Sequence, residues 1–206
     1  MTPAEDGGRA AAEPKADRRR ALVVAAYRRI ATDGFEGLRT RDVAADVGVN
    51  IATLHYYFPT KEKLIEGVVE HAMRRFQSTL EPHGTSADQL RNYLRAVRRL
   101  VQDEPELGAV MGELMLRSSR DPTLAGTMEQ MYEVWHRTVR GLLKRAVKEG
   151  HMRPDADSDE VAAIIVATLT GVSLPSAGGR PDLAMRQLER WLGIGAAPRR
   201  PSQATD

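Results

Sequence analysis

The stretch TRDVAADVGVNIATLHYYFPTKEKL, residues 40–64, has the spacing of a compact helix-turn-helix. Small or branched apolar side chains recur at helical spacing on one face: Val43, Ala44 and Val47. Gly48 follows where a helix needs a residue that tolerates positive φ, so we expect the first helix to end there. Asn50 then supplies an N-cap for a second short helix, whose Leu54 returns to the shared core. The connection is too short for anything but a steeply crossed helix pair.

The outer face of this second helix carries small, hydrogen-bonding or aromatic side chains: Ile51, Ala52, Thr53, His55 and Tyr56. In helix-turn-helix proteins the second helix enters the major groove, where hydroxyl, imidazole and methyl groups read donor, acceptor and thymine-methyl patterns. These residues and Asn50 are therefore candidates for DNA contact. The alternative is a solvated helical hairpin in an ordinary bundle. A glycine turn, a small residue beneath it and a capped short helix rarely coincide without a groove to fill.

Two helix N-termini flank the candidate recognition helix. We expect Thr40 to cap the helix that carries Arg41, and Thr60 to cap the next helix at Lys61. Each N-terminus offers free backbone N–H groups and the positive end of the helix dipole, which favour a phosphate. Both are candidate contacts to the DNA backbone, and such contacts position a protein without reading sequence.

Residues 18–69 resemble the N-terminal domain of TetR-type (tetracycline-repressor-like) transcriptional regulators. The resemblance rests on four segments: Asp33-Gly34-Phe35, Gly37-Leu38-Arg39-Thr40, Val43-Ala44-x-x-x-Gly48-Val49-Asn50 and Leu54-His55-Tyr56-Tyr57-Phe58-Pro59-Thr60-Lys61-Glu62-Lys63-Leu64. It implies dimer contacts from the two last helices and a ligand cavity in the C-terminal part. The family usually has Tyr where this sequence has His55. The resemblance implies a phosphate contact for His55, a side chain whose charge depends on pH.

Composition bounds the possible classes of protein. A chain of 206 residues with 42% hydrophobic content can build one or two modest domains. The sequence has no Cys, which excludes disulfides and thiolate chemistry and fits a reducing compartment. The longest apolar stretch, residues 161–169, is far shorter than the ~20 residues that span a bilayer. Residues 1–15 lack the apolar run of a signal peptide, so we expect a soluble cytoplasmic protein with no membrane partner.

The formal net charge is only +2, but it is unevenly distributed. Residues 15–75 hold twelve Lys or Arg and eight Asp or Glu, a balance of +4, so the remainder of the chain carries −2. An excess of positive charge around the helix-turn-helix is what phosphate neutralisation requires, although a balance of this size is a weak signal by itself.

Beyond Leu64 the chain continues as amphipathic segments. Apolar stripes at helical spacing occupy residues 65–80, 90–101, 107–115 and 128–147. Asp121-Pro122 is a typical N-cap and N1 pair, and Gly150 is expected to end the helix that begins there. No run of alternating β-branched residues occurs, so the predicted fold class is all-α. The predicted divisions are a disordered tail, a helix-turn-helix DNA-binding domain, a helical effector-binding and dimerisation domain and a second disordered tail: 1–15, 16–64, 65–193 and 194–206.

The segment 161–173 is apolar nearly all round, which predicts a helix buried on two sides. We expect one side to meet its own domain and the other a second subunit. A following helix over 182–192 is expected to pair with it through inward side chains: Ala184, Leu188, Trp191 and Leu192. Two such hairpins make a four-helix dimer interface. The candidate interface residues are Val161, Ile164, Ile165, Leu169, Val172, Leu188 and Trp191. The alternative is a buried central helix in a monomer.

Methionine and aromatic side chains concentrate in the middle of the chain, on two helices expected to face each other: Met111, Met115, Met128, Met131, Tyr132 and Trp135. Such side chains line adaptable apolar cavities, but a stripe of this kind also forms plain core. The family resemblance implies a ligand cavity here. We therefore expect a small, largely apolar effector, whose higher affinity for a dimer geometry that no longer matches successive major grooves releases the DNA.

No motif indicates catalysis. The five histidines are scattered, without metal-ligand spacing, and no P-loop, dinucleotide fingerprint or G-x-S-x-G is present. We expect no catalytic residue, metal or cofactor. The sequence predicts a homodimeric repressor that binds an inverted-repeat operator in double-stranded DNA. Two alternatives stay open: an effector-independent or activating DNA-binding regulator, and a helical ligand-binding or interaction protein without DNA binding.

Overall fold

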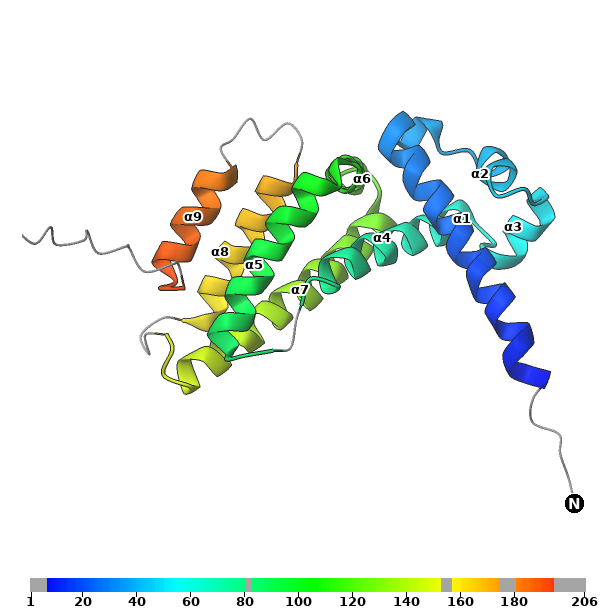
Figure 1. Ribbon diagram of the computed structural model, residues 1–206. Coiled ribbons are helices and arrows are strands. Elements are labelled where there is room, and N and C mark those ends of the chain that lie inside the picture. Colours follow the sequence, from blue (N-terminus) through cyan, green and yellow to red (C-terminus); the bar gives the residue numbers. More distant parts are fainter. Residues whose placement is uncertain (1–6, 81–82, 153–156, 175–180, 195–206) are drawn as a thin grey trace, which may run out of the picture.

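The computed structural model describes residues 7–80, 83–152, 157–174 and 181–194, and all of its regular structure within these ranges is helical. The fold class predicted from the sequence is confirmed. The helices, drawn in Figure 1, are α1 (Gly7–Gly37), α2 (Thr40–Asp46), α3 (Ile51–Tyr57), α4 (Lys61–Gln77), α5 (Ser86–Asp103), α6 (Pro105–Ser118), α7 (Pro122–Lys148), α8 (Ser158–Ser173) and α9 (Pro181–Trp191).

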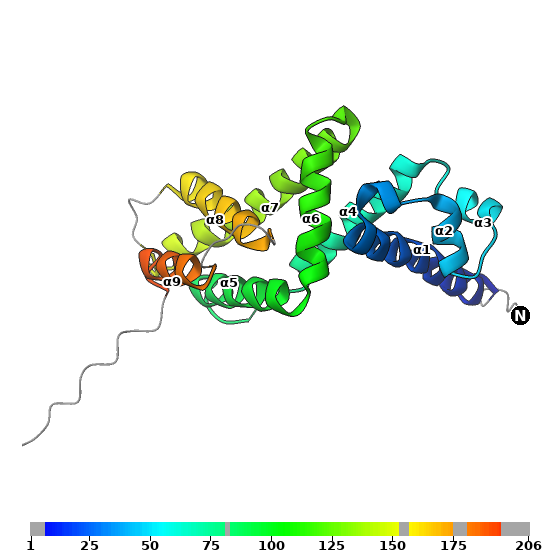
Figure 2. The same cartoon turned by 90° about the horizontal axis from the view of Figure 1, so that it is seen from above.

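The molecule is elongated, with α1, α2 and α3 at one end and α5, α8 and α9 at the other (Figures 1 and 2). Helix α4 links the two groups, because it packs on α1 at one end and on α7 at the other. Helix α6 also packs closely on α1. Buried apolar side chains from both groups form one connected core, so the N-terminal helices are not an isolated module.

Helix α1 begins earlier than the sequence analysis expected. We predicted disorder over residues 1–15, but residues 7–15 are helical. The run Ala10-Ala11-Ala12 has high helix propensity, and extending an existing helix needs no new nucleation. Residues 1–6 and 195–206, also predicted to be disordered, lie outside the described residues. At its other end α1 is interrupted at Gly34, whose φ of 67° few other residues adopt.

Side-chain caps set the starts of several helices that follow α4. Thr85 and Asp88 form a reciprocal capping box at the start of α5. The Asp121 carboxylate accepts hydrogen bonds from the backbone N–H groups of Thr123 and Leu124, as the Asp121-Pro122 pair predicted. Helix α7 ends where predicted, because Gly150 adopts a φ of 74° just beyond it.

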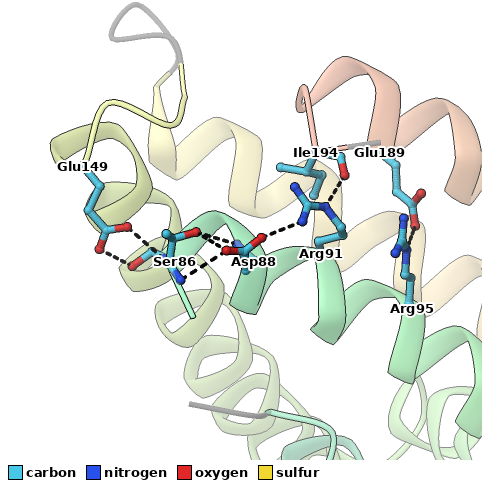
Figure 3. Close-up of polar contacts among 8 residues, drawn as sticks. Ser86, Asp88, Arg91, Arg95, Glu149, Glu189 and Ile194 are labelled. Atoms are coloured by element: carbon cyan, nitrogen blue, oxygen red, sulfur yellow. Dashed lines mark hydrogen bonds and ion pairs between the residues drawn. The ribbon is translucent and has the colours of Figure 1, made fainter. Parts of the chain in front are cut away.

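Helix α9 is held on α5 by a row of arginines (Figure 3). Arg91 donates to the backbone carbonyl of Ile194, and Arg95 lies 3.4 Å from the Glu189 carboxylate. One turn further along α5, Arg98 pairs with Asp182 at 3.5 Å. These contacts fix which face of α9 meets its own subunit and leave the opposite face outward.

A cluster of buried aromatic side chains lies between α4, α5 and α7. The Trp135 indole N–H donates to the Tyr93 hydroxyl, and the Trp135 ring stacks on Phe76 with ring centroids 5.1 Å apart. Burial raises the pKa of Tyr93, because its charged form cannot be hydrated there. Within the described ranges, no helix has both the length and the apolar character that a membrane crossing requires.

Candidate nucleic-acid interface

The turn between α2 and α3 is built as the sequence spacing predicted. The Gly48 N–H donates to the Ala45 carbonyl at 3.0 Å, and the Val49 N–H donates to the Ala44 carbonyl at 2.9 Å. Gly48 has a φ of 70°, and a Cβ built there would meet nothing within 4 Å. The requirement for glycine is therefore conformational, because the backbone angle and not the available space disfavours other residues.

Helix α3 is anchored on one side only. Leu54 and Phe58 are fully buried beneath it, while the Asn50 side chain caps its start. Asn50 Oδ1 accepts hydrogen bonds from the Thr53 N–H at 2.8 Å and the Thr53 hydroxyl at 2.9 Å. The predicted N-cap is confirmed. Because the Thr53 proton is already used, its hydroxyl oxygen remains a hydrogen-bond acceptor toward the outside.

The predicted DNA-contact residues of α3 lie on its outer side. Ala52, His55 and Tyr56 are exposed, and Tyr56 retains 66% of its accessible surface. Ile51 and Thr53 are half-buried, so their outer atoms remain accessible at the edge of the same face. The face consequently offers a methyl group, an imidazole, a phenol and a hydroxyl oxygen on a helix short enough to enter a groove.

Thr60 caps the start of α4, as predicted. The Thr60 hydroxyl oxygen accepts from the Lys63 N–H at 3.3 Å, and Lys61 is exposed beside it. Sequence reasoning missed Glu62, whose pKa is lowered because its carboxylate accepts from its own backbone N–H and from the Thr60 hydroxyl. A resident carboxylate thus already occupies part of this N-terminus, and it reduces the attraction for a phosphate there.

The start of α2 differs from the prediction. Thr40 is the first residue of the helix and not its cap, so the predicted capping role is wrong. Arg39 takes the N-cap position without a side-chain hydrogen bond, because its extended backbone precedes the helix and its side chain has no acceptor suited to the first N–H groups. Thr40 is half-buried and Arg41 is exposed, so Arg41 remains available to a phosphate.

Much of the positive charge counted on this part of the chain is used internally. Arg29 makes a bidentate contact with Asp46, at 2.6 and 2.8 Å, and also lies within 4.0 Å of Asp33 and Asp42. The Arg29 hydrogen bond lowers the pKa of Asp46. Arg29 therefore ties α1 to α2, and its charge is offset by acids of this protein. The charge count from the sequence could not distinguish such a residue from one that faces DNA.

Comparison with known proteins identifies this arrangement. Residues 22–68 match the family model for bacterial regulatory proteins of the tetR family, and residues 80–184 match the model for the tetracyclin repressor-like C-terminal domain. The chain belongs to the TetR family. It is a DNA-binding regulator of that family, whose members in general are not enzymes, bind DNA as dimers and respond to small-molecule effectors.

The curated relatives include nucleoid occlusion factor SlmA. The chain is 26% identical to SlmA of Photobacterium profundum over 167 residues, which cover 78% of this chain and 84% of the relative. It is 30% identical to SlmA of Serratia proteamaculans over 124 residues, covering 58% and 62% of the two chains.

Solved TetR-family structures share the fold. A regulator from Rhodococcus aligns with a TM-score of 0.76 at 23% identity, and one from Haloarcula marismortui aligns with 0.77 at 17% identity. In both cases 87% of this chain and 98% of the other are covered. A transcriptional regulator from Saccharomonospora viridis, solved in complex with choline, aligns with a TM-score of 0.68 at 24% identity, covering 86% and 96%.

The residues expected at the TetR-type dimer interface divide into two sets. Ile164 and Trp191 are exposed, at 51% and 68% of their surfaces, and Val161 and Val172 are half-buried. The other three are buried within the protomer core: Ile165, Leu169 and Leu188.

The inward face of α9 differs from the prediction. Leu188 and Leu192 are buried as expected, but Ala184 and Trp191 are exposed, and Met185 is buried instead. The arginines of α5 hold α9 in a rotation that the local apolar pattern did not specify. Leu183, which the sequence analysis did not select, is exposed at 46% on this helix.

Of the six residues expected around an effector, four lie in the core and two line a groove. Met111, Met128, Met131 and Trp135 are buried in the core, as the alternative interpretation of this stripe stated. Met115 and Tyr132 line an open groove of about 990 Å³ between α6, α7 and α8. The remaining lining residues are Glu129, Gln130, Glu133, His136, Ala163, Val166, Ala167, Thr170, Gly171 and Leu174.

Proposed function

We propose that this TetR-family regulator is a homodimeric repressor that binds an inverted-repeat operator through α3 and releases it when a small effector binds. The observation that carries the proposal is the exposed outer face of α3, which is held outward by a buried Leu54 and a side-chain cap at Asn50. Contacts to DNA are assigned to Thr40, Arg41, Asn50, Ile51, Ala52, Thr53, His55, Tyr56 and Lys61.

A homodimer is supported by the apolar surface that α8 and α9 leave outward. Along α8, Ile164 is exposed and Val161 and Val172 are half-buried, and Leu183 and Trp191 are exposed on α9. Large exposed apolar side chains grouped on neighbouring helices are typical of a protein interface. We assign the dimer contacts to this surface, with the buried Ile165, Leu169 and Leu188 supporting it from beneath.

The groove between α6, α7 and α8 is the proposed effector site. Its lining is mainly apolar, with Glu129, Glu133 and His136 among its polar members. This chemistry suits a largely apolar ligand that carries a cationic or hydrogen-bonding group. The Saccharomonospora viridis regulator was solved with choline, a small cation of this kind, which makes choline a suitable first probe. We expect no catalysis at this groove, since the proposed response is a change of DNA affinity.

A route from the groove to α3 is supported by one long-range hydrogen bond. Glu113 lies on α6, two residues from Met115 of the groove, and its carboxylate accepts from the Phe35 N–H at 3.1 Å. Phe35 follows the interruption of α1 at Gly34. A ligand that shifts α6 therefore acts on the end of α1, against which α2 packs, and α3 packs on α2 in turn.

Selection of fragments from random duplex DNA by the purified full-length protein tests this function. The expected result is an inverted repeat, bound by two protomers, with half-sites one or more helical turns apart. Enrichment of no sequence, together with no salt-dependent binding to any duplex, would favour the helical interaction protein instead. A selected duplex whose affinity is unchanged by every stabilising ligand found in a thermal-shift screen would favour the effector-independent regulator.

A further inference from the structure

The Lys15 side chain of α1 reaches the recognition helix α3. The Lys15 ammonium donates to the Tyr56 hydroxyl at 2.7 Å, and it also lies 4.9 Å from the centre of the Tyr56 ring. The two residues are 41 positions apart in the sequence, so the contact depends on α1 running past the end of α3, as Figure 1 shows. From the sequence, Lys15 entered only the charge count of residues 15–75 and was placed in the tail expected to be disordered.

Lys15 belongs to a basic stripe that points toward α3. Lys15, Arg18 and Arg19 lie seven, four and three residues before the fully buried Leu22, which places them on the same helix face. Arg19 confirms this direction, because its guanidinium lies 5.0 Å from the centre of the Phe58 ring. All three are exposed, so the face of α1 that packs on the core at Leu22 continues as a basic surface beside α3.

Lys15 differs from nearby basic residues in the charge of its partner. Arg19 lies 3.9 Å from Glu70, and Lys63 lies 2.8 Å from Glu66, so acids of this protein offset those charges. The hydrogen-bond partner of Lys15 is a neutral phenol. Within the described part of the chain, no ion pair joins Lys15 to an acid. The Tyr56 hydrogen bond raises the pKa of Lys15, so the ammonium stays charged when Tyr56 is bound to it.

We propose that Lys15 and Tyr56 together clamp one phosphate of the DNA backbone at the edge of α3, so that the N-terminal turns of α1 form part of the DNA-binding surface. The ammonium has three N–H donors, one of which donates to the Tyr56 hydroxyl oxygen. The Tyr56 O–H proton is then still available for donation. Both groups can therefore donate to the same phosphate oxygens, and charge-assisted bonds of this kind are the stronger ones. The clamp rests on the proposed operator binding and reads no base.

The test measures duplex affinity against KCl concentration for the full-length wild type and for Lys15→Met, Tyr56→Phe and the double variant. Lys15→Met keeps the aliphatic stem and removes the charge. We expect it to bind about tenfold more weakly at 0.1 M salt and to reduce the slope of log K against log salt by about 0.9 per protomer. The loss is equal for operator and unrelated duplex, and the double variant loses less than the sum of the two single losses.

Lys144→Met is the matched control, because Lys144 is an exposed lysine on α7, outside the helix-turn-helix. We expect it to bind with wild-type affinity and slope, and circular dichroism melts check that every variant folds. Replacing single phosphates by neutral methylphosphonates locates the clamp: one phosphate per half-site weakens the wild type and leaves Lys15→Met unaffected.

Wild-type affinity and slope in Lys15→Met would overturn the clamp while leaving operator binding intact. A weakened Lys15→Met with an unchanged salt slope would also overturn it, because Lys15 would then act only by orienting Tyr56. Failure of the wild type to bind any duplex would instead overturn the proposed function, and the clamp with it.

Discussion

The two ends of the molecule present different chemistry to their surroundings. At one end α3 exposes small and polar groups on a helix fixed from beneath by Leu54 and capped by Asn50. At the other end α8 exposes Ile164 and α9 exposes Trp191, and a row of α5 arginines holds the opposite side of α9. The first surface suits a hydrated, charged polymer. The second is apolar, and burying it against another apolar surface is favourable in water.

The largest loss of DNA affinity is expected from a charge introduced into the apolar surface of α8 and α9. Ile164→Glu puts a charge at the centre of the proposed dimer face, where burial of an unpaired carboxylate is strongly unfavourable. We expect a monomer by analytical ultracentrifugation and an operator affinity about a thousandfold weaker, because one α3 contacts only a few base pairs.

Leu116→Glu provides the matched control for that variant. Leu116 on α6 is 63% exposed but is outside the α8 and α9 surface. It is expected to leave the dimer and its DNA affinity unchanged. A dimeric Ile164→Glu protein would place the interface elsewhere on the molecule.

At the other end, Leu54→Ala is expected to damage the support of α3. Leu54 is fully buried, and removal of such a side chain costs about 2–5 kcal/mol of unfolding free energy. Chemical denaturation measures the loss, and we expect DNA affinity to fall while the C-terminal dimer persists. Simultaneous loss of the dimer would contradict this expectation, since it would show that the damage spreads from α3 through the connected core to α8 and α9.

The sequence predicted best what short-range geometry decides. Gly48, Asn50 and Thr60 were placed correctly because a positive φ and a side-chain cap depend on residues within three positions. The cap at Thr40 was wrong by one residue, since Arg39 already has an extended backbone and precedes the helix. Local pattern thus locates a turn reliably and the first residue of a helix less so.

Features that depend on distant partners were missed. The Arg29 partners Asp42 and Asp46 and the partner of Lys15 come from other helices, so their pairing is invisible in a charge count. The rotation of α9 is set by α5, and the burial of Met128 and Trp135 depends on the packing of α4 and α5 against α7. Composition predicted that the methionine stripe was apolar, but it could not separate a filled core from a groove wall.

A smaller effect is expected from removing the hydrogen bond between Glu113 of α6 and the Phe35 N–H of α1. Glu113→Ala removes the acceptor of the Phe35 N–H, and loss of a hydrogen bond to a charged group costs about 1.5–3 kcal/mol. We expect faster hydrogen exchange at the Phe35 amide and a lower unfolding free energy, as well as a DNA affinity that no longer responds to ligands of the groove. Glu106→Ala, an exposed acid on the same helix, is the control and should change none of these.

The smallest expected effect is a pH dependence at the boundary of α1 and α4. The pKa of His71 is lowered by burial and by the nearby Arg74, Arg75 and Arg20, and its ring lies edge-on to Tyr27. A lowered folded-state pKa means that the unfolded chain binds the proton more readily. His71 therefore stabilises the fold above its unfolded pKa, near 6.5, and this stability is lost as the pH falls.

Denaturation between pH 7.5 and 5 checks this prediction. The unfolding free energy of the wild type is expected to fall more steeply with acid than that of His71→Gln. Parallel curves for the two proteins would show that His71 titrates alike in both states.

In the proposed complex the outer face of α3 meets DNA, and a single substitution on that face is decisive. Ala52 is exposed on that face, so Ala52→Glu adds a carboxylate there without disturbing the buried side. Binding to the selected duplex is measured for wild type, Ala52→Glu and Lys144→Glu, each confirmed as a folded dimer. We expect Ala52→Glu to abolish binding and Lys144→Glu to retain it, despite its larger change of charge. Wild-type affinity in Ala52→Glu would show that DNA does not meet the outer face of α3.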